Sequence, residues 1–119
     1  MIRRLPGAVR DREEGSAAVV AIGVVAGTIL VTAAVLAGCA GVVGHQRAVA
    51  AADASSLAAA DVASGLLAGD PCERAAAVAR ANGAELVLCD VDGGVARTEA
   101  AVAAGPLSLT ARSRAGPPP

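Results

Sequence analysis

The hydrophobic pattern of the chain changes abruptly at His45. From Ser16 to Val43 there are 28 consecutive residues without a charge. As a helix, this run would measure about 42 Å at about 1.5 Å per residue. That length exceeds the hydrocarbon core of a bilayer, which is about 30 Å thick. The pattern therefore predicts a transmembrane helix over 16–44, preceded by a leader over 1–15.

Basic residues are distributed unevenly about this segment. The leader carries four arginines, whereas the twenty residues that follow Val43 carry only Arg47. The arginines of the leader are Arg3, Arg4, Arg10 and Arg12. Because cytoplasmic flanks are enriched in basic residues, we expect a single-pass plasma-membrane protein with a cytoplasmic N-terminus and an extracytoplasmic C-terminal domain.

Alanine-rich sequence follows the apolar run and predicts that the helix continues over 45–68. The simplest structure is one helix from about Ser16 to Leu67. Asp53 and Asp61 should mark its solvated side. Its larger apolar side chains form a sparse stripe suited to packing on a small sheet or on another helix: Val49, Leu57 and Leu66.

The sequence "GDPCE", which begins at Gly69, should end this helix and start another. Glycine favours a helix C-terminus, while Asp70 suits an N-cap, Pro71 the first helical position and Glu73 the capping-box partner. A second helix should therefore run from Pro71 to about Ala81 and end at Asn-Gly.

The remaining sequence has the short alternating pattern of strands. "AELVLCDV" predicts a strand, "DGG" a tight turn, and "VARTEAAV" either a strand or a helix. "LSLTARS" alternates cleanly, so Leu107, Leu109 and Ala111 should face the interior, and 115–119 should be a disordered tail. We expect an α+β fold in which a pilin-like long N-terminal helix, transmembrane in its first half, carries a small ectodomain (69–114) of one helix and two to three antiparallel strands.

Two of the three cysteines, Cys72 and Cys89, lie on the extracytoplasmic side of the predicted span, where disulfides persist. A bond between them would join the start of a helix to the middle of a strand. It would be worth about 3 kcal/mol in the chain-entropy model, which matters in a domain without Phe, Tyr or Trp. The alternative is a pair of unpaired buried thiols.

The third cysteine, Cys39, leaves other interpretations of the apolar run open. "LAGC", Leu36 to Cys39, resembles the lipobox of bacterial lipoproteins, in which the cysteine becomes the lipidated first residue. The apolar character continues beyond it, however, through "AGVVG". A cleaved signal peptide fits poorly because its apolar region is usually about 7 to 15 residues. If the segment is neither a lipoprotein signal nor a cleaved signal peptide, Cys39 is a small hydrophobic residue within the transmembrane helix.

Small residues recur at four-residue spacing within the run. Gly23 with Gly27, and Ala34 with Gly38, form small-x-x-x-small pairs of the kind that allow membrane helices to approach closely. They predict a helix-packing face for a partner subunit.

The rest of the composition argues against catalysis and nucleic-acid binding. The net charge is −1 and the arginines are scattered, so a basic face for phosphates is not expected. His45 is the single histidine, and no zinc spacing or phosphate loop occurs. "DVDGG" from Asp90 lacks calcium ligands at Gly94 and Ala101 and indicates a hairpin turn. We therefore expect no enzyme, cofactor, metal or small-molecule substrate.

Two sequence segments carry a family resemblance. "EEGSAAVVAIGVV" and "GHQRAVAAADASSLAAA" resemble the N-terminal region of TadE/TadG-like proteins of the tight-adherence (Flp) pilus system. "PCERAAAVARANGAELVLCDVDG" resembles short actinobacterial TadE-like proteins encoded near helicase and secretion genes, in which paired cysteines also occur. The resemblance implies a membrane-anchored pseudopilin-like component that assembles with other pseudopilin subunits or with a pilus assembly platform.

Prepilin-like members of such systems are cut after a glycine, and the resemblance makes Gly15–Ser16 the candidate cleavage site. The fifth residue of the cut chain is commonly Glu, but Val20 stands there in this sequence. An uncut TadG-like anchor is therefore an equal alternative.

Overall fold

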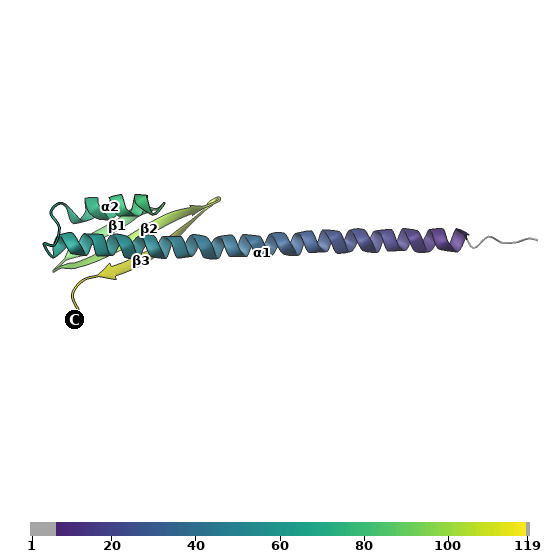
Figure 1. The fold of residues 1–119 in the computed structure, drawn as a ribbon, viewed down its shortest axis with the longest axis horizontal. Helices are drawn as coiled ribbons and strands as arrows, with labels where there is room; N and C mark the ends of the chain where they lie inside the picture. The colour runs from purple at the N-terminus through teal and green to yellow at the C-terminus, as the bar shows by residue number, and fades with distance from the viewer. Residues whose placement is uncertain (1–6, 119) are drawn as a thin grey trace, which may run out of the picture. The chain divides into compact units, whose positions relative to one another are not determined.

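A computed structural model describes the backbone of residues 7–118 and the side chains from Glu13 onward. The fold is α+β (Figure 1). Its elements, in chain order, are α1 (Gly7–Ala63), α2 (Pro71–Ala81), β1 (Glu85–Asp92), β2 (Val95–Ala104) and β3 (Leu107–Ala115). The chain divides into two units, Met1–Gly38 and Cys39–Pro119, and α1 contributes to both.

Helix α1 begins and ends earlier than the sequence predicted. Its first residue is Gly7 instead of Ser16, and its last is Ala63 instead of Leu67. The end is set by Gly65, whose φ of 82° lies in the left-handed region. The amide of Gly65 donates to the carbonyl of Val62, and the amide of Leu66 donates to that of Asp61. This pair of bonds is the Schellman motif, so Gly65, and not Gly69, terminates the helix.

The predicted bounds of α2, its Asp70 N-cap and its first residue, Pro71, are confirmed. The helix runs from Pro71 to Ala81, and the Asp70 side chain accepts a hydrogen bond of 2.9 Å from the amide of Glu73. Proline at the first helical position needs no partner for its nitrogen. Asn82 forms the C-cap, and its amide reaches the last carbonyls of the helix.

The three strands form one antiparallel sheet in the order β1-β2-β3. Gly93 and Gly94, at the tip of the first hairpin, have φ values of 57° and 79°, as a two-residue type I′ turn requires. The predicted turn is thus confirmed, and "VARTEAAV" is a strand. β3 includes Ala115, which the sequence analysis assigned to the tail.

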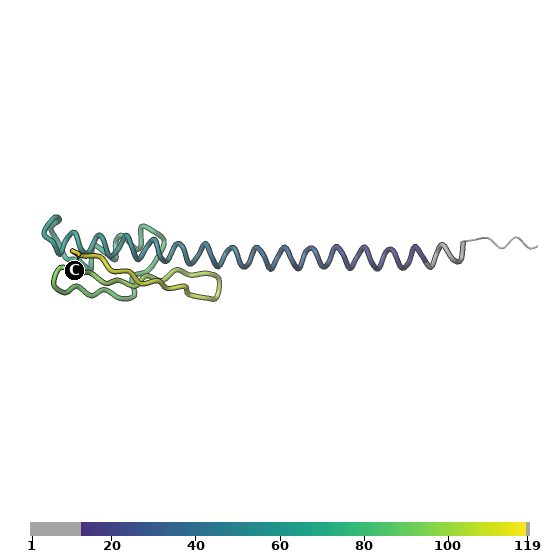
Figure 2. Tube along the Cα trace, turned by 90° about the horizontal axis from the view of Figure 1, so that it is seen from below, coloured from purple at the N-terminus to yellow at the C-terminus, as the bar shows by residue number. Residues whose placement is uncertain are grey.

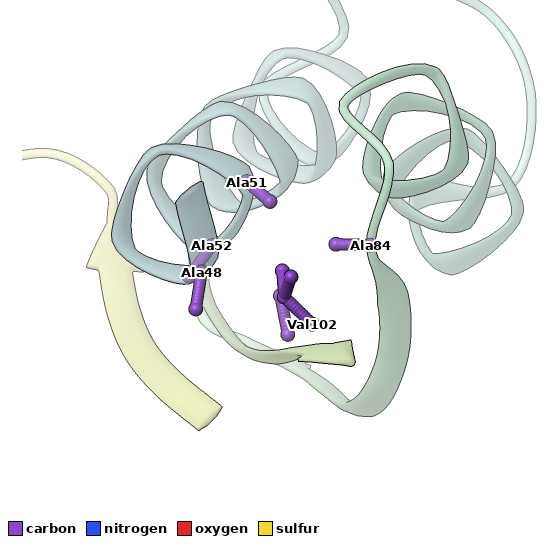
Figure 3. Packing of buried hydrophobic residues seen from close by; sticks show 6 residues of the cluster. Ala48, Ala51, Ala52, Ala84 and Val102 are labelled. Atoms are coloured by element: carbon purple, nitrogen blue, oxygen red, sulfur yellow. The ribbon is translucent and has the colours of Figure 1, made fainter. Parts of the chain in front are cut away.

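In the unit that begins at Cys39, helices and strands form two layers. α2 and the C-terminal part of α1 cover the same face of the sheet, and no element within residues 7–118 covers the opposite face (Figures 1 and 2). The core between the layers is built from small side chains (Figure 3). Its two clusters contain Ala48, Ala51, Ala52, Ala84, Ala100 and Val102, and Ala59, Ala75 and Ala96.

The predicted packing stripe on the helix is wrong. Leu57 is 59% exposed and Leu66 is 75% exposed, while Val49 is only partly buried. Leu57 lies on the same exposed helix face as Asp53 and Asp61, which are solvated as expected. The sheet packs instead on the alanine and serine face, because small side chains allow a helix and a sheet to approach closely without voids.

The prediction that alternate residues of β3 face the interior is confirmed in part. Leu109 and Ala111 are partly buried toward α1, whereas Leu107 is 67% exposed. Leu107 pairs with Ala104 in the last rung of the β2–β3 ladder. β1 begins opposite Ala101, so this rung lies beyond the part of the sheet that β1 widens and has fewer neighbours to cover it.

Candidate functional site

The most distinctive surface of the unit Met1–Gly38 is apolar. Its described side chains are all exposed, and none between Gly15 and Gly38 is charged. Within residues 7–118, α1 is long and apolar enough to cross a membrane, by length and composition. The largest exposed side chains of this unit are Val19, Val20, Ile22, Val24, Val25, Ile29, Leu30, Val31, Val35 and Leu36.

The four predicted helix-packing residues share one face of α1. At about 3.6 residues per turn, Gly23, Gly27, Ala34 and Gly38 fall within an arc of about 60°. A Cβ atom added to any of the three glycines would meet nothing within 4 Å. The face is therefore open, and a second helix could approach it closely.

The candidate cleavage site lies inside α1, which already begins at Gly7. Gly15 and Ser16 are exposed, and a Cβ added to Gly15 would also meet nothing within 4 Å. The acidic residues Glu13 and Glu14 immediately precede the site and are exposed. The arginines of the predicted leader fall at positions whose side chains are outside the described residues.

Cys39 is exposed and forms no disulfide. It is also the first residue of the compact unit Cys39–Pro119. A chain that began at Cys39 would therefore retain every residue of that unit.

Buried hydrogen bonds attach the sheet to α1. Thr98 Oγ1 donates to the carbonyl of Ala52 at 2.9 Å, and neither the threonine nor the alanine has appreciable exposure. Near the end of the helix, Ser56 Oγ forms hydrogen bonds with the carbonyl of Asp53 at 2.9 Å and with Ser113 Oγ at 3.1 Å. Ser55 Oγ is buried and has no partner among the described residues.

A disulfide links Cys72, in the first turn of α2, to Cys89 in β1. The two Cα atoms are 5.8 Å apart, within the usual range for this bond. The predicted pairing is thus present. It attaches α2 to the sheet at the edge strand, where α2 would otherwise depend on a small apolar cluster around Ala75 that includes Leu86 and Val91.

The uncovered face of the sheet is polar and holds paired charges. Arg112 Nε lies 2.6 Å from Glu99 Oε2, and Arg97 Nη1 lies 3.9 Å from Asp90 Oδ2. Asp90, Arg97, Arg112 and Arg114 line an open groove of about 630 Å³, together with Leu88, Thr98 and Ser113. The Arg97–Asp90 pair is largely solvated and contributes little to stability, whereas the Glu99 side chain of the other pair is only 15% exposed.

Catalytic groupings are sparse in the described chain. His45 is exposed on α1. Among the residues whose side chains are described, no three His, Cys, Asp or Glu side chains come together as a metal site would require. The "DVDGG" sequence forms the end of β1 and, at Gly93 and Gly94, the β1–β2 turn.

Comparison with protein-family models, curated proteins and solved structures found no match to this chain. The surfaces described above are therefore the basis for a functional proposal.

The sequence analysis missed the helix face that carries the sheet. Its buried positions recur at three- and four-residue intervals, as one helix face requires. They are Gly44, Ala48, Ala51, Ala52, Ser55, Ser56, Ala59 and Val62. This spacing could have identified the buried face. Small residues are so abundant in this chain, however, that the prediction was based on the larger side chains of Val49, Leu57 and Leu66.

Proposed function

We propose that this chain is a non-enzymatic, single-pass plasma-membrane protein that acts as a pseudopilin-like (TadE/TadG-like) component of a tight-adherence pilus assembly or secretion apparatus. Its N-terminus lies in the cytoplasm and its disulfide-bonded domain lies outside. Its partners are other pseudopilin-like subunits or the assembly platform.

One observation carries this proposal. A single helix, α1, supplies an uncharged, exposed apolar segment and, further along, the buried face on which the sheet packs. An exposed run of this length has a large free-energy cost in water, since each buried CH₂ group contributes about 0.8 kcal/mol. A bilayer or the apolar helices of partner subunits would remove that cost. The same helix would then fix the small domain at the membrane surface, as a pilin-like arrangement requires.

The other surfaces are consistent with a role in assembly. The open small-residue face around Gly23 and Gly27 offers a helix-packing surface within the membrane. The sheet face outside it carries polar and charged groups, which suit contacts that form and dissociate. The sequence resemblance to TadE/TadG-like proteins points to the same class.

A second candidate function is a lipoprotein lipidated at Cys39 that binds an envelope ligand. The specific observation in its favour is that the compact unit begins at Cys39, which is exposed and unbonded. Cleavage before this residue would leave the disulfide and the whole sheet in the mature protein.

Intact-mass measurement of the protein purified from membranes distinguishes these possibilities. A full-length chain supports the uncut anchor, and loss of residues 1–15 supports a processed pseudopilin. Cleavage before Cys39, together with the added mass of a diacylglycerol, would support the lipoprotein and contradict both the uncut anchor and the processed pseudopilin. The Cys39→Ser variant is the control, because only the lipoprotein depends on that thiol. Recovery of the unlipidated chain in the soluble fraction without detergent would contradict membrane anchoring altogether.

A further inference from the structure

The β2–β3 hairpin runs alongside α1 and ends where the apolar run of the helix ends. Ala96 belongs to the same buried cluster as Ala59, the Thr98 hydroxyl donates to the carbonyl of Ala52, and Val102 belongs to the same buried cluster as Ala48. Successive residues of β2, from Ala96 to Val102, therefore lie beside positions of α1 that are progressively closer to its N-terminus. The trend continues to Gly44, where an added Cβ would lie 2.8 Å from Leu109 Cδ1 and 3.6 Å from Ala104 Cβ.

We name the segment Val102–Leu109 the hairpin tip. It contains no charge, and the uncharged stretch extends from residue 100 to residue 111. All charges of β2 and β3 lie farther from the turn, beginning with the Glu99–Arg112 pair. Leu107 is 67% exposed at the tip, and Pro106 beside it is also exposed.

The apolar run of the helix ends at the level of this hairpin tip. On one side of Gly44, Val42 and Val43 expose 62% and 51% of their surface. On the other side, the exposed polar residues His45, Gln46 and Arg47 follow immediately. The uncharged hairpin tip therefore reaches the level at which the helix changes from apolar to polar, and the first charges of the hairpin, Glu99 and Arg112, lie farther toward the C-terminal end of α1.

If the apolar run spans the membrane, its length places Gly44 and the neighbouring hairpin tip at the membrane surface. The run from Ser16 to Val43 would measure about 42 Å as a helix. A bilayer measures about 30 Å across its hydrocarbon core and about 40–45 Å with its headgroups. If the run spans the membrane, its end at Val43 lies among the headgroups, and so does the hairpin tip that packs beside Gly44.

From this geometry we propose that the hairpin tip seats in the outer lipid–water interface, with Leu107 inserted as its apolar contact. The tip gives the domain a second attachment to the bilayer beside α1. This restrains tilt of the domain relative to the membrane and holds its charged, uncovered face in a fixed orientation to the lipid surface. The inference rests on the proposed membrane anchoring and adds a second lipid contact to it.

Site-directed fluorescence in vesicles tests the insertion. The full-length Cys39→Ser protein, with its disulfide intact, is given a single additional cysteine by Leu107→Cys, labelled with the polarity-sensitive dye NBD and reconstituted into phosphatidylcholine–phosphatidylglycerol vesicles. The matched control is Leu66→Cys, which replaces an equally large and even more exposed leucine in the α1–α2 connection. Intact mass verifies that Cys72 and Cys89 remain bonded in both proteins.

We expect the dye at position 107 to emit at shorter wavelength than the dye at position 66, and to lose fluorescence when the acyl chains are brominated. Emission at 107 that matches position 66 would overturn the proposal. A short-wavelength emission that brominated lipids fail to quench would also overturn it, since it would mean that another copy of the chain, instead of lipid, covers Leu107.

A third labelled position separates this inference from the proposed function. Ile29→Cys lies in the middle of the apolar run, where brominated lipids should quench the dye if α1 spans the membrane. Quenching at 29 without quenching at 107 would reject the hairpin contact alone. An unquenched dye at 29 would reject the membrane anchor and, with it, the hairpin contact.

Discussion

The hydroxyl group of Thr98, in the central strand, donates a hydrogen bond of 2.9 Å to the main-chain carbonyl of Ala52 in α1. The two residues are 46 positions apart in the sequence, and Thr98 is 1% exposed. The bond joins the layers where the side chains are smallest. Because alanines give little apolar area, a directional bond at this position helps to fix how the helix lies on the sheet.

Removal of this hydroxyl should destabilise the domain. We expect Thr98→Val to lower the free energy of unfolding by about 1 kcal/mol, the usual net value of one buried hydrogen bond. The Ala52 carbonyl would keep its helical partner. Hydrogen exchange of β2 amides, followed by mass spectrometry on the full chain in detergent, measures the change. Thr110→Val is the control, since Thr110 is exposed in the same sheet. Equal effects of the two substitutions would contradict the role assigned to the bond.

The close approach at Gly44 should not tolerate a large side chain. We expect Gly44→Leu to detach the β2–β3 hairpin from α1, because even a Cβ at this position meets Leu109 at 2.8 Å. Overpacking of this kind typically costs about 1–3 kcal/mol. Limited proteolysis within β3 reports the detachment. Gly41→Leu has open space around it and should leave the cleavage rate unchanged, so a similar rise in both variants would argue against hairpin packing at Gly44.

The disulfide should account for much of the stability of the domain. Its loop spans a sequence separation of 17, which corresponds to about 3 kcal/mol in the chain-entropy model. We therefore expect the paired substitution Cys72→Ser and Cys89→Ser to lower the urea midpoint markedly, as followed by far-UV circular dichroism. Cys39→Ser should have no effect, because that cysteine is exposed and unbonded. An unchanged midpoint in the double variant would show that alanine packing alone holds α2 in place.

The buried face of α1 can be tested against the face that the sequence analysis favoured. Ala51 is fully buried, whereas Leu57 is 59% exposed. We expect Ala51→Leu to destabilise the domain by about 1–3 kcal/mol through overpacking, and Leu57→Ala to change stability by less than about 0.5 kcal/mol. Thermal unfolding of the two variants in the same detergent gives the comparison. A larger loss for Leu57→Ala would favour the original stripe.

The small-residue face of the apolar segment should be needed for association with partner subunits. We expect Gly23→Leu with Gly27→Leu to reduce crosslinked partner recovered from membranes, because leucines would hold the helices apart. Val25→Leu is the control; it lies on the opposite side of α1 by helical geometry and should leave crosslinking intact. Unchanged recovery in the glycine variant would remove this interface from the proposed assembly.

Several features of the fold could be predicted because each depends on residues that are neighbours in sequence. The apolar run follows from consecutive uncharged residues, and α2 follows from a cap formed by Asp70 and Pro71. The glycine pair at 93–94 specifies a hairpin whatever surrounds it. The cysteine pair could be predicted because the disulfide joins elements that the local signals had already placed.

The tertiary structure decided which face of α1 is buried, and there the sequence prediction failed. The prediction was based on leucine and valine because burial of these large side chains contributes most to stability. The sheet nevertheless lies against Ala51 and Ala52. What selects the small face is the distance between helix and sheet, a property of both layers together that no local pattern contains. The helix ends at Ala63, and not at the predicted Leu67, for a local reason: Gly65 adopts a left-handed backbone conformation.

The sequence by itself thus determined the elements, their caps and the uncharged segment, since these arise from interactions within a few residues along the chain. Only the folded structure brought Thr98 to Ala52 and Leu109 to Gly44. Those contacts depend on how closely two layers of small side chains can pack, and they decide which surfaces remain free to meet lipid or a partner.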